Sequence, residues 1–454
     1  MRKLIALALS LTLLLGCFGL QLHAADDTTP FRVVCTHAGE DGKTIGLHWY
    51  TKADCGNVIK IDDAVMYIDA PANVLHQGSY AHRVTLSGFA AGPHTYDIDG
   101  VTGTFHINPG PDNDFSFIVT GDVQASSEAD YAYGAAVHQA AWEQFPDAAF
   151  SVILGDHTNN SNNEEWDMFF QAFRPVLANG ALVPIAGNHD GNLKWNWFRN
   201  MFTLKEPANY TSNMTGVYYS FDYGDAHIAV LNTNDMYPMS VMQRNWFLND
   251  MMQSGAKWKL VFMHRAPYSA GNDGNLPDNI IMRNVLLPLF DKAGVDLVMY
   301  GHDHQYVRTM PMKGDKPVGD GTGIYTDPAG TLYLLPGAAC PKRYPIHPNM
   351  LPAVRNAMAL HTQIGKPFFT GITIEDDTLT YTAYTCDPAN GDTEEYDHLS
   401  ITKTTFPAPN PNYKPLPTDF LSTLPQQIWS FFTMVFRAVF VDYLFGLLPV
   451  AIRG

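Results

Sequence analysis

The sequence predicts an α/β protein with two domains, a small β-sandwich followed by a larger domain of alternating strands and helices. Residues 31–110 hold short strand-like runs separated by Gly, Asp and Pro, which is typical of a β-sandwich. From Phe115 onward, apolar runs alternate with helical segments, which indicates βαβ units in an α/β sheet. The length of 454 residues, of which 46% are hydrophobic, supplies a core for both domains.

The larger domain is expected to span residues 114–403, after a linker with the sequence NPGPDND. Its strand-like runs include FSFIVTGD, FSVILGD, LVPIAGNHD, HIAVLNTND, WKLVFMH and VDLVMYGHDH. Helical segments such as YAYGAAVHQAAWEQF and SVMQRNWFLNDMMQ lie between them. The later runs, from GTLYLLPGA to HLSITK, are strands without helices and are expected to complete the sheets.

Residues 1–24 have the features of an export signal. Arg2 and Lys3 precede an apolar segment, and cleavage after Ala24, behind LHA, fits this pattern. Lipid attachment at Cys17, within LLGC, is the alternative, although the apolar residues that follow Cys17 favour simple cleavage. Both routes predict a secreted, periplasmic or cell-surface protein.

The C-terminal region separates into a Pro-rich linker at residues 404–420 and a hydrophobic tail at residues 421–454. A membrane-spanning helix needs about 20 predominantly apolar residues, but Arg437 and Asp442 interrupt this tail. Three alternatives stay open: a helix in the membrane interface, a helix docked on the body of the protein, and a membrane span. Membrane association through the tail is therefore one of the expected interactions.

Four cysteines lie outside the signal: Cys35, Cys55, Cys340 and Cys386. In an exported protein they can form disulfides, and the pairs Cys35–Cys55 and Cys340–Cys386 keep both partners within one domain. Four cysteines nevertheless allow three pairings, and four buried free thiols are an equal alternative. No CxxC spacing indicates a zinc site.

The composition argues against a nucleic-acid partner. The formal net charge is −17 at pH 7, whereas nucleic-acid-binding proteins carry a broad basic surface. An acidic chain that handles an anionic substrate needs local cations, either metal ions or a few Arg and Lys side chains. The sequence leaves the oligomeric state open.

Five of the strand-like runs end in residues that bind metals or transfer protons. These residues are Asp122, Asp156, Asn188 with His189, His264, and the pair His302 and His304. Ligands in open α/β sheets collect outside the carboxyl ends of the strands, so these side chains are expected to converge. Glycines just before the polar residues allow a sharp turn and a close backbone approach; they are Gly121, Gly155, Gly187 and Gly301.

The donor set mixes oxygen and imidazole ligands without a thiolate, which suits Mn, Fe or Zn. There are more donors than one ion needs, so the pattern predicts a site for two metal ions. Any one of the motifs alone would more readily indicate a turn or a surface loop. All five in order, each at the end of an apolar strand, favour the metal site.

The series GDVQ, GDHTNN, GNHD, MHRAPY and GHDH resembles the calcineurin-like metallophosphoesterases, in particular their purple acid phosphatase-like branch of bacterial type. The resemblance covers about residues 31–403 and includes YYSFDYGDAHIAVLNTN and GTLYLLPGAA. It implies a fibronectin III-like sandwich at residues 31–110. It further implies a four-layer α/β/β/α catalytic domain at residues 114–403.

The resemblance also implies the roles of the strand-end residues. One metal would be held by Asp122, Asp156 and His304. The second would be held by Asp156, Asn188, His264 and His302, so that Asp156 bridges the two ions. His189 would donate a proton to the leaving alkoxide or stabilise its charge. Asp190 either orients His189 or caps a turn.

Several residues depart from the family pattern. Gln124 stands where many relatives have His and the purple enzymes have Gly, and its amide oxygen either ligates the first metal, which we favour, or forms a hydrogen bond outside it. Asn159 replaces the tyrosinate of the purple enzymes, so their colour should be absent and the metal pair is open among Fe, Mn and Zn. Asn272 and Asp273 replace two histidines that bind substrate phosphate in plant-type relatives.

Arg265, next to the expected ligand His264, is the candidate replacement cation because a guanidinium can bind phosphate oxygens bidentately. An outward-facing Arg265 is the equal alternative. Lys342 and Arg343 are weaker candidates, and we expect them to be solvated. Three aromatic residues lie in loops that could border the cleft, where we expect packing rather than stacking on a substrate ring: Trp195, Trp197 and Tyr237.

The expected function is hydrolysis of phosphate esters at two metal ions, with a small-molecule phosphomonoester as the first candidate substrate. A phosphodiesterase or nucleotide pyrophosphatase with the same metals is one alternative. The other is a catalytically inactive binding protein at the cell surface, which the departures at Gln124, Asn159 and Asp273 would suit. Six expected ligands remain in place, however, and they favour the enzyme.

Overall fold

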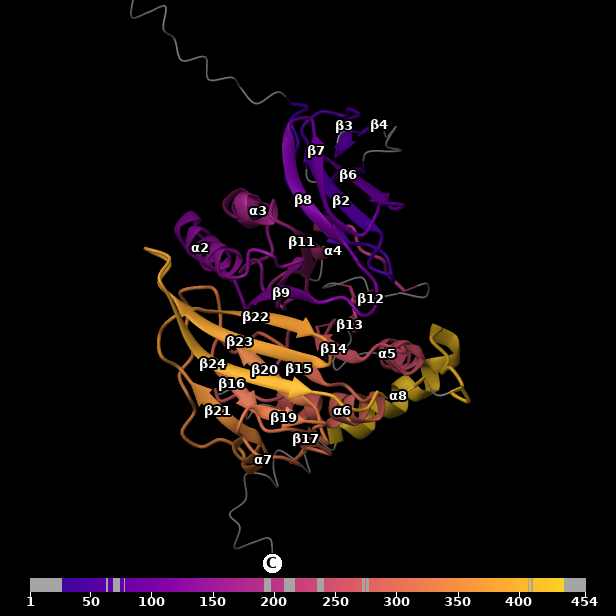
Figure 1. Cartoon of the computed structure of the whole chain (residues 1–454), viewed down its shortest axis with the longest axis vertical. Coiled ribbons are helices and arrows are strands. Elements are labelled where there is room, and N and C mark those ends of the chain that lie inside the picture. The colour runs from indigo at the N-terminus through magenta and orange to yellow at the C-terminus, as the bar shows by residue number, and fades with distance from the viewer. Residues whose placement is uncertain are drawn as a thin grey trace, which may run out of the picture.

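The structure is a computed structural model of the chain. It describes residues 27–62, 64–67, 74–76, 78–191, 197–207, 217–234, 241–271, 274, 277–406, 408–409 and 411–436 (Figure 1). The predicted export signal, Cys17 included, and residues 437–454 of the predicted tail lie outside these residues. Within them, two large sheets face each other and helices cover their outer faces.

The first sheet has eleven strands, and three of them lead into the loops that carry Asp122, Asp156 and Asn188. In spatial order its strands are β19 (Ile324–Thr326), β24 (Thr393–Thr402), β23 (Thr378–Cys386), β22 (Phe368–Glu375), β9 (Phe115–Thr120), β10 (Phe150–Ile153), β11 (Ala181–Pro184), β1 (Phe31–His37), β2 (Ile45–Thr51), β6 (Ser79–Leu86) and β5 (Val74–His76). β9, β10 and β11 run parallel. Their carboxyl ends therefore meet at one edge of the sheet.

Helices α2 (Glu128–Gln144) and α3 (Asn163–Leu177) connect these three parallel strands. Ser127 caps α2 by accepting the N–H of Asp130, and Asn162 caps α3 by accepting the N–H of Glu165. The buried face of α3 repeats at spacings of three and four residues, as an amphipathic helix requires; it comprises Trp166, Phe169, Phe170, Phe173, Val176 and Leu177.

The second sheet has seven strands in the order β12 (Tyr219–Tyr223), β13 (Ala226–Val230), β14 (Trp258–Phe262), β15 (Leu297–Met299), β20 (Leu332–Pro336), β16 (Tyr306–Thr309) and β21 (Met358–Thr362). β13, β14, β15 and β20 run parallel. Helices α5 (Val241–Gln253) and α6 (Pro277–Ala293) belong to this half. Two smaller pieces complete it: α7 (Pro352–Ala357) and the hairpin of β17 (Met312–Lys313) and β18 (Lys316–Pro317). The short helix α4 (Trp197–Met201) packs on the first half, where Tyr50 of β2 donates to the carbonyl of Asn200 at 2.6 Å.

Side chains alternate between the two faces of the second sheet. Ile228 and Phe262 belong to the core between the sheets, where the Phe262 ring meets that of Phe117 edge-on with centroids 5.9 Å apart. Ala229 and Val261 face the other way, into a core that α5 and α6 share. This arrangement gives four layers, helices outside and sheets inside, and agrees with the mixed α/β fold predicted from the sequence.

The strands of the predicted N-terminal sandwich divide between two sheets. β4 (Ala64–Tyr67), β3 (Val58–Ile61), β7 (Gly92–Ile98) and β8 (Val101–Ile107) form a separate four-stranded sheet. The remaining strands extend the eleven-stranded sheet, in which β1 runs parallel to β11 with Thr36 opposite Leu182. The buried Arg32 forms an ion pair of 2.8 Å with Asp167 of α3. The N-terminal strands thus share a sheet with the larger domain, and the fibronectin III-like character of this region stays a prediction.

Within the described residues, neither Cys35–Cys55 nor Cys340–Cys386 forms a disulfide. Cys35 is fully buried within β1, whereas Cys55 is half-exposed after β2. Cys340 and Cys386 are each buried separately, and burial raises the pKa of the Cys386 thiol to about 12. The alternative of free thiols, most of them buried, is the one that the structure shows.

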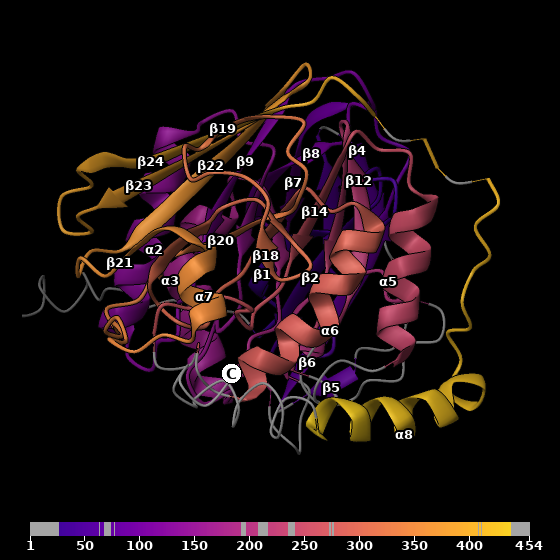
Figure 2. The same cartoon turned by 90° about the horizontal axis from the view of Figure 1, so that it is seen from below.

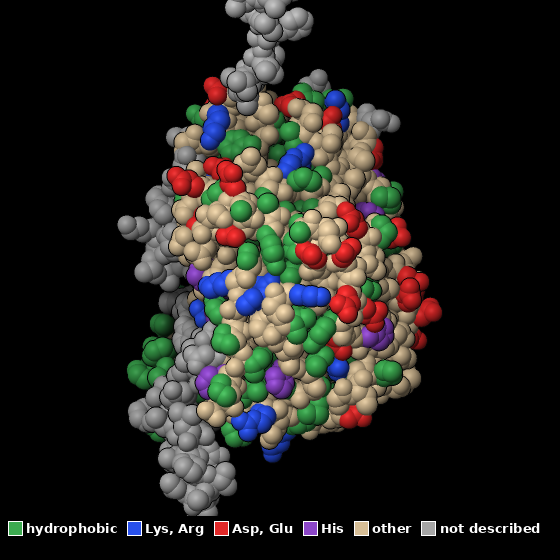
Figure 3. Space-filling model, turned by 90° about the vertical axis from the view of Figure 1, so that its left-hand side faces the viewer, with side chains coloured by type: hydrophobic (Ala, Val, Ile, Leu, Met, Phe, Trp, Pro, Cys, Tyr) green, Lys and Arg blue, Asp and Glu red, His purple; other side chains and the backbone are tan. Residues whose placement is uncertain are grey.

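The C-terminal segment packs against α5 and α6 and ends the described chain in α8 (Phe420–Phe436) (Figure 2). Asn249 binds both the N–H and the carbonyl of Leu416, and Arg244 donates to Ser430 Oγ at 2.7 Å. Among the described residues, no helix has the length and apolar character needed to cross a membrane. The face of the molecule in Figure 3 carries acidic and basic side chains in separate small groups.

Candidate metal centre

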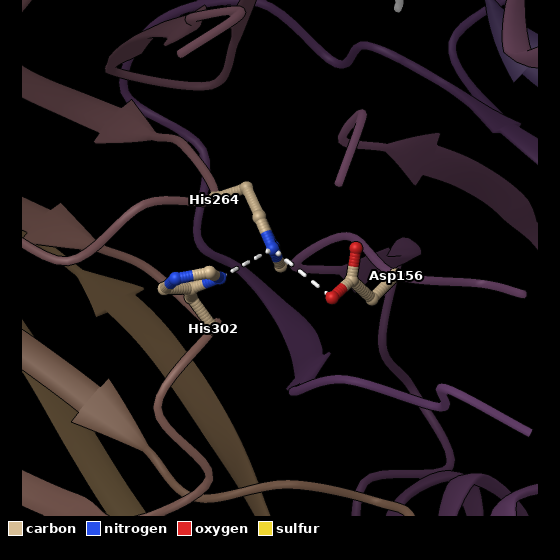
Figure 4. A group of neighbouring side chains, drawn as sticks. All are labelled: Asp156, His264 and His302. Atoms are coloured by element: carbon tan, nitrogen blue, oxygen red, sulfur yellow. Dashed lines mark hydrogen bonds and ion pairs between the residues drawn. The ribbon is translucent and has the colours of Figure 1, made fainter. Parts of the chain in front are cut away.

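The strand-end residues predicted to converge do meet in the structure. Asp122 follows β9, Asp156 follows β10, His264 follows β14 and His302 follows β15, so both sheets contribute. Ligand atoms of Asp156, His264 and His302 all lie within 4.8 Å of one another. Figure 4 shows the His264 ring between the other two side chains.

The predicted second metal set centres on Nε2 of His264. This atom lies 3.0 Å from Asn188 Oδ1, 3.3 Å from Asp156 Oδ2 and 3.3 Å from His302 Nδ1. Its other nitrogen, Nδ1, is 2.8 Å from the carbonyl oxygen of Leu154, which can only accept, so Nδ1 carries a proton. Nε2 is therefore left to bind a cation, in the arrangement usual for metal-ligating histidines.

The charges around Asp156, His264 and His302 favour a cation at this position. Burial would lower the pKa of His264, but the nearby carboxylates of Asp156 and Asp122 raise it to about 9. Burial works to raise the pKa of Asp156, yet the surrounding histidines hold it below its usual range. Burial, together with the charges of His264 and Arg265, keeps the pKa of His302 well below the ordinary value, so His302 is neutral and can act as a ligand.

Two residues of the predicted first metal set, Asp122 and His304, are in contact. Nε2 of His304 lies 3.2 Å from Asp122 Oδ2, and both side chains are fully buried. His304 Nδ1 is 3.1 Å from the carbonyl oxygen of Lys342 and 3.4 Å from Cys340 Sγ. Burial lowers the pKa of His304, but Asp122 raises it well above the ordinary value. The contact with Cys340 was not predicted, because no sequence pattern relates these two residues.

The backbone around the two sets is held in unusual conformations. Asp156, His302 and His304 have φ values of 48°, 82° and 48°, in the left-handed region that is uncommon for non-glycine residues. Gly187 lies so close to Asp156 that an added Cβ would overlap its backbone N and Oδ1. At Gly155, with φ of 103°, an added Cβ would overlap the His264 ring. The predicted need for glycine in these turns is confirmed at both positions.

His189 is half-buried beside the bridging carboxylate. Its backbone N–H donates to Asp156 Oδ1 at 2.8 Å, and its ring Nδ1 lies 2.6 Å from the carbonyl oxygen of Asn159. Asn159 thus contributes to the site through its backbone. It fixes the orientation of the imidazole and leaves Nε2 of His189 available for proton transfer.

Asp190 connects the two loops that carry Asp156 and His189. Its carboxylate accepts the N–H groups of Gly187 at 2.8 Å and Thr158 at 3.1 Å, and it binds Nδ1 of the buried His157 at 3.0 Å. Of the two roles predicted for Asp190, these contacts favour the turn cap. His157 was missed at the sequence level, since the histidine of GDHTNN gives no sign of a partner 33 residues away.

Gln124 and Lys342 meet at the edge of the first set. Gln124 is buried, and its Oε1 accepts a hydrogen bond of 3.1 Å from Lys342 Nζ. The amide oxygen that was expected to ligate a metal thus faces an ammonium group. The solvation predicted for Lys342 holds for most of its side chain, while its tip reaches the site.

The remaining predicted residues lie at the margin of the site or outside the described chain. Arg265 is half-exposed, and its backbone N–H donates to Thr233 Oγ1 at 3.0 Å. Arg343 donates to the hydroxyl of Tyr133 at 3.2 Å. Trp197 is 4% exposed, which confirms packing for this residue. Four residues lie outside the described chain: Asn272, Asp273, Trp195 and Tyr237.

Comparisons with known proteins identify the domain that holds the site. The family model of calcineurin-like phosphoesterases matches residues 115–306. An uncharacterised protein from Mycobacterium tuberculosis is 24% identical over 327 residues, covering 62% of this chain and 61% of that protein. Human acid phosphatase type 7 is 25% identical over 230 residues, which cover 44% of this chain and 51% of the enzyme. The chain thus spans about half to three-fifths of these relatives.

Solved structures show the same fold. A purple acid phosphatase from yellow lupin (Lupinus luteus) seeds superimposes with a TM-score of 0.66 at 16% identity, covering 83% of this chain and 75% of the enzyme. The structure of PhoD gives a TM-score of 0.54 at 10% identity over 84% of this chain and 94% of PhoD. The family match at residues 115–306 and the relatives make this chain similar to calcineurin-like phosphoesterases and acid phosphatases, and its fold resembles that of the lupin enzyme.

Proposed function

We propose that this chain hydrolyses small-molecule phosphomonoesters at a pair of metal ions. The observation that carries the proposal is the arrangement around Asp156. Its carboxylate lies next to His264 of the second set. Its backbone carbonyl accepts a hydrogen bond of 2.6 Å from the N–H of Gln124, which was predicted to belong to the first set. Asp122 and His304 contact each other at 3.2 Å, and Asn188 and His302 both contact Nε2 of His264.

The donors fit the predicted ions. Oxygen and imidazole atoms converge in a buried site, and His264 and His302 each have one ring nitrogen directed at the group. Fe, Mn and Zn all suit this set. When bound, two such cations stabilise the charge that develops on the phosphoryl group and activate water for in-line attack. Asp122 and Asp156 supply the anionic charge that offsets them.

The other groups of the chain position substrate and move protons. His189, held at Nδ1 by the Asn159 carbonyl, presents Nε2 to the leaving oxygen. As the imidazolium, with both ring nitrogens protonated, it donates the Nε2 proton to this oxygen as the ester bond breaks and is left as the neutral ring. Asp190 and His157 keep the two loops at a fixed separation, so that His189 and Asp156 act on the same substrate. Arg265, beside His264, is proposed to bind a phosphate oxygen.

The proposal is tested by assaying monoester and diester hydrolysis on the same metal-loaded protein. We expect turnover of p-nitrophenyl phosphate to exceed that of bis(p-nitrophenyl) phosphate, with both lost in Asp156→Ala. Higher turnover of the diester would favour the phosphodiesterase or pyrophosphatase alternative. Metal binding and phosphate binding without turnover of either ester would favour the inactive binding protein.

We further propose that the protein is exported, as its N-terminal sequence predicts, and that α8 associates with a membrane surface. Among the side chains of α8 that the structure describes, seven apolar ones are exposed, and Leu421, Trp429 and Phe432 are 79%, 73% and 65% exposed. The opposite side of the helix is fixed to α5 through Ser430. Aromatic side chains on such a face insert readily into the interfacial layer of a bilayer.

A further inference from the structure

Lys342 belongs to a loop that is fixed to the metal ligands by its backbone. The N–H of Ala339 donates to the carbonyl of Asp122 at 3.0 Å, and His304 Nδ1 binds the Lys342 carbonyl at 3.1 Å. Gln363 then donates to the carbonyls of both His304 and Tyr344, at 2.7 and 3.2 Å. The position of the Lys342 backbone is therefore set by the same residues that form the first metal set.

The side chain of Lys342 returns toward the site. Its Nζ lies 3.1 Å from Gln124 Oε1 and 5.1 Å from the centre of the Tyr344 ring, and that ring lies 4.6 Å from the His304 ring. Within the described residues, no carboxylate lies within ion-pair distance of this ammonium. A neutral amide thus holds one of the three N–H groups of Lys342, and the other two are available to an anion.

The two cationic side chains of the site flank opposite metal sets. Arg265 directly follows His264, a residue of the predicted second set, so it belongs to that set. Lys342 contacts Gln124 and His304, so it belongs to the first. A phosphate group placed between the sets would meet one cation at each end. A phosphate dianion binds an ammonium more strongly than a neutral amide does, so it can draw Lys342 away from Gln124.

We propose that Lys342 binds a phosphate oxygen of the substrate, and that Gln124 is its positioning residue rather than a ligand of the first metal. This inference rests on the proposed function, because it assigns a substrate contact to that site. In the free enzyme, Gln124 holds the ammonium beside the first set. When substrate enters, Lys342 exchanges the amide oxygen for phosphate.

The inference is tested by measuring the affinity of inorganic phosphate for the metal-loaded full chain by calorimetry, beside metal content by mass spectrometry. Lys342→Ala should weaken phosphate binding about tenfold, as expected for one hydrogen bond to a charged group, with metal content unchanged. Lys342→Arg should recover part of the affinity. Lys366→Ala removes an exposed lysine paired with Glu394 and should leave phosphate affinity at the wild-type value.

Gln124 is tested with two variants that separate its roles. Gln124→Ala and Gln124→Glu should both keep the wild-type metal content; the first frees Lys342 and the second holds it in an ion pair. Both should weaken phosphate binding and raise KM for a monoester more than they lower kcat. Loss of metal in Gln124→Ala with retention in Gln124→Glu would instead show that residue 124 is a ligand, and would overturn the assignment.

These measurements separate failure of the Lys342 inference from failure of the proposed function. If Lys342→Ala binds phosphate as tightly as wild type while the enzyme still hydrolyses monoesters, the inference fails and the function stands. If wild type hydrolyses no ester but binds phosphate, and Lys342→Ala weakens that binding, the function fails and the phosphate contact stands. Binding of neither metal nor phosphate by wild type would overturn both.

Discussion

The imidazole of His189 is oriented by the backbone of Asn159, whose carbonyl oxygen lies 2.6 Å from Nδ1. A carbonyl can only accept a hydrogen bond, so Nδ1 of His189 is the protonated nitrogen. The other nitrogen, Nε2, is therefore the one that the proposed proton donor presents to the substrate, and it carries a proton in the imidazolium form. Because Asn159 acts through its backbone and His189 through its ring, removing the two side chains should have different effects on kcat.

His189→Ala should lower kcat for an alkyl phosphate by about 10²–10⁴-fold, the usual contribution of a general acid. The loss should be much smaller for p-nitrophenyl phosphate, because nitrophenolate leaves without a proton. Asn159→Ala keeps the carbonyl and should leave this ratio near wild type. An equal loss on both substrates, or loss of metal in His189→Ala, would contradict the role of a proton donor.

Gly187→Ala should reduce metal content, because the added Cβ overlaps the backbone N and Oδ1 of Asp156. The expected result is less than half of the wild-type metal per chain, with activity reduced in proportion. Gly56→Ala is the matched control, since an added Cβ at Gly56 meets no atom within 4 Å. Wild-type metal content in Gly187→Ala would show that the loop has more room than the structure gives it.

The metal-free protein should lose stability as the pH rises from about 6.5 to 9. Neighbouring carboxylates outweigh burial and raise the pKa of His264 to about 9, above its unfolded value of about 6.5. The stabilisation is complete below the unfolded pKa and disappears as the pH passes the folded one. His304, whose pKa is also raised, acts in the same direction.

Chemical denaturation at several pH values, with chelator and with metal, measures this effect. His227 must be separated from it, because Asp222 and Asp250 outweigh burial and raise its pKa to about 9 as well. His227 is no predicted ligand, so its share should persist when metal is bound, whereas the share of His264 and His304 should vanish. Identical pH profiles with and without metal would exclude these two histidines as ligands.

Trp429→Asp with Phe432→Asp should abolish binding of the full chain to lipid vesicles, since both side chains project from α8 into solvent. Co-sedimentation with phosphatidylcholine–phosphatidylglycerol vesicles measures the effect. Val318→Asp, which changes an exposed apolar residue elsewhere, is the matched control. Unchanged sedimentation of the double variant would refute the membrane proposal, and a change from dimer to monomer instead would assign the face to a second copy.

The convergence of the candidate metal ligands could be predicted from the sequence for a physical reason. Each of Asp122, Asp156 and His264 ends an apolar strand, and parallel strands bring their carboxyl ends to one edge whatever the connections between them. The four-layer order follows in the same way from the alternation of strands and helices. These features depend on local pattern and on the rules of sheet packing.

Other features depend on contacts between distant residues and were not predictable. Lys342 and Gln124 are 218 positions apart, and a loop after β20 brings them together. The parallel pairing of β1 with β11 joins regions that composition separates into two domains. The predicted disulfide pairs are not found for a related reason. An even number of cysteines in an exported chain does not reveal that Cys35 is buried inside a sheet.

The central claim is that two metal ions bind around Asp156 and carry out phosphate ester hydrolysis. Metal content by plasma mass spectrometry, on wild type and on Asp156→Ala, tests it most directly when monoesterase activity is assayed on the same samples. We expect close to two ions per chain in the wild type, and joint loss of metal and activity in the variant. A wild-type chain that stays metal-free and inactive with Mn, Fe and Zn would contradict it.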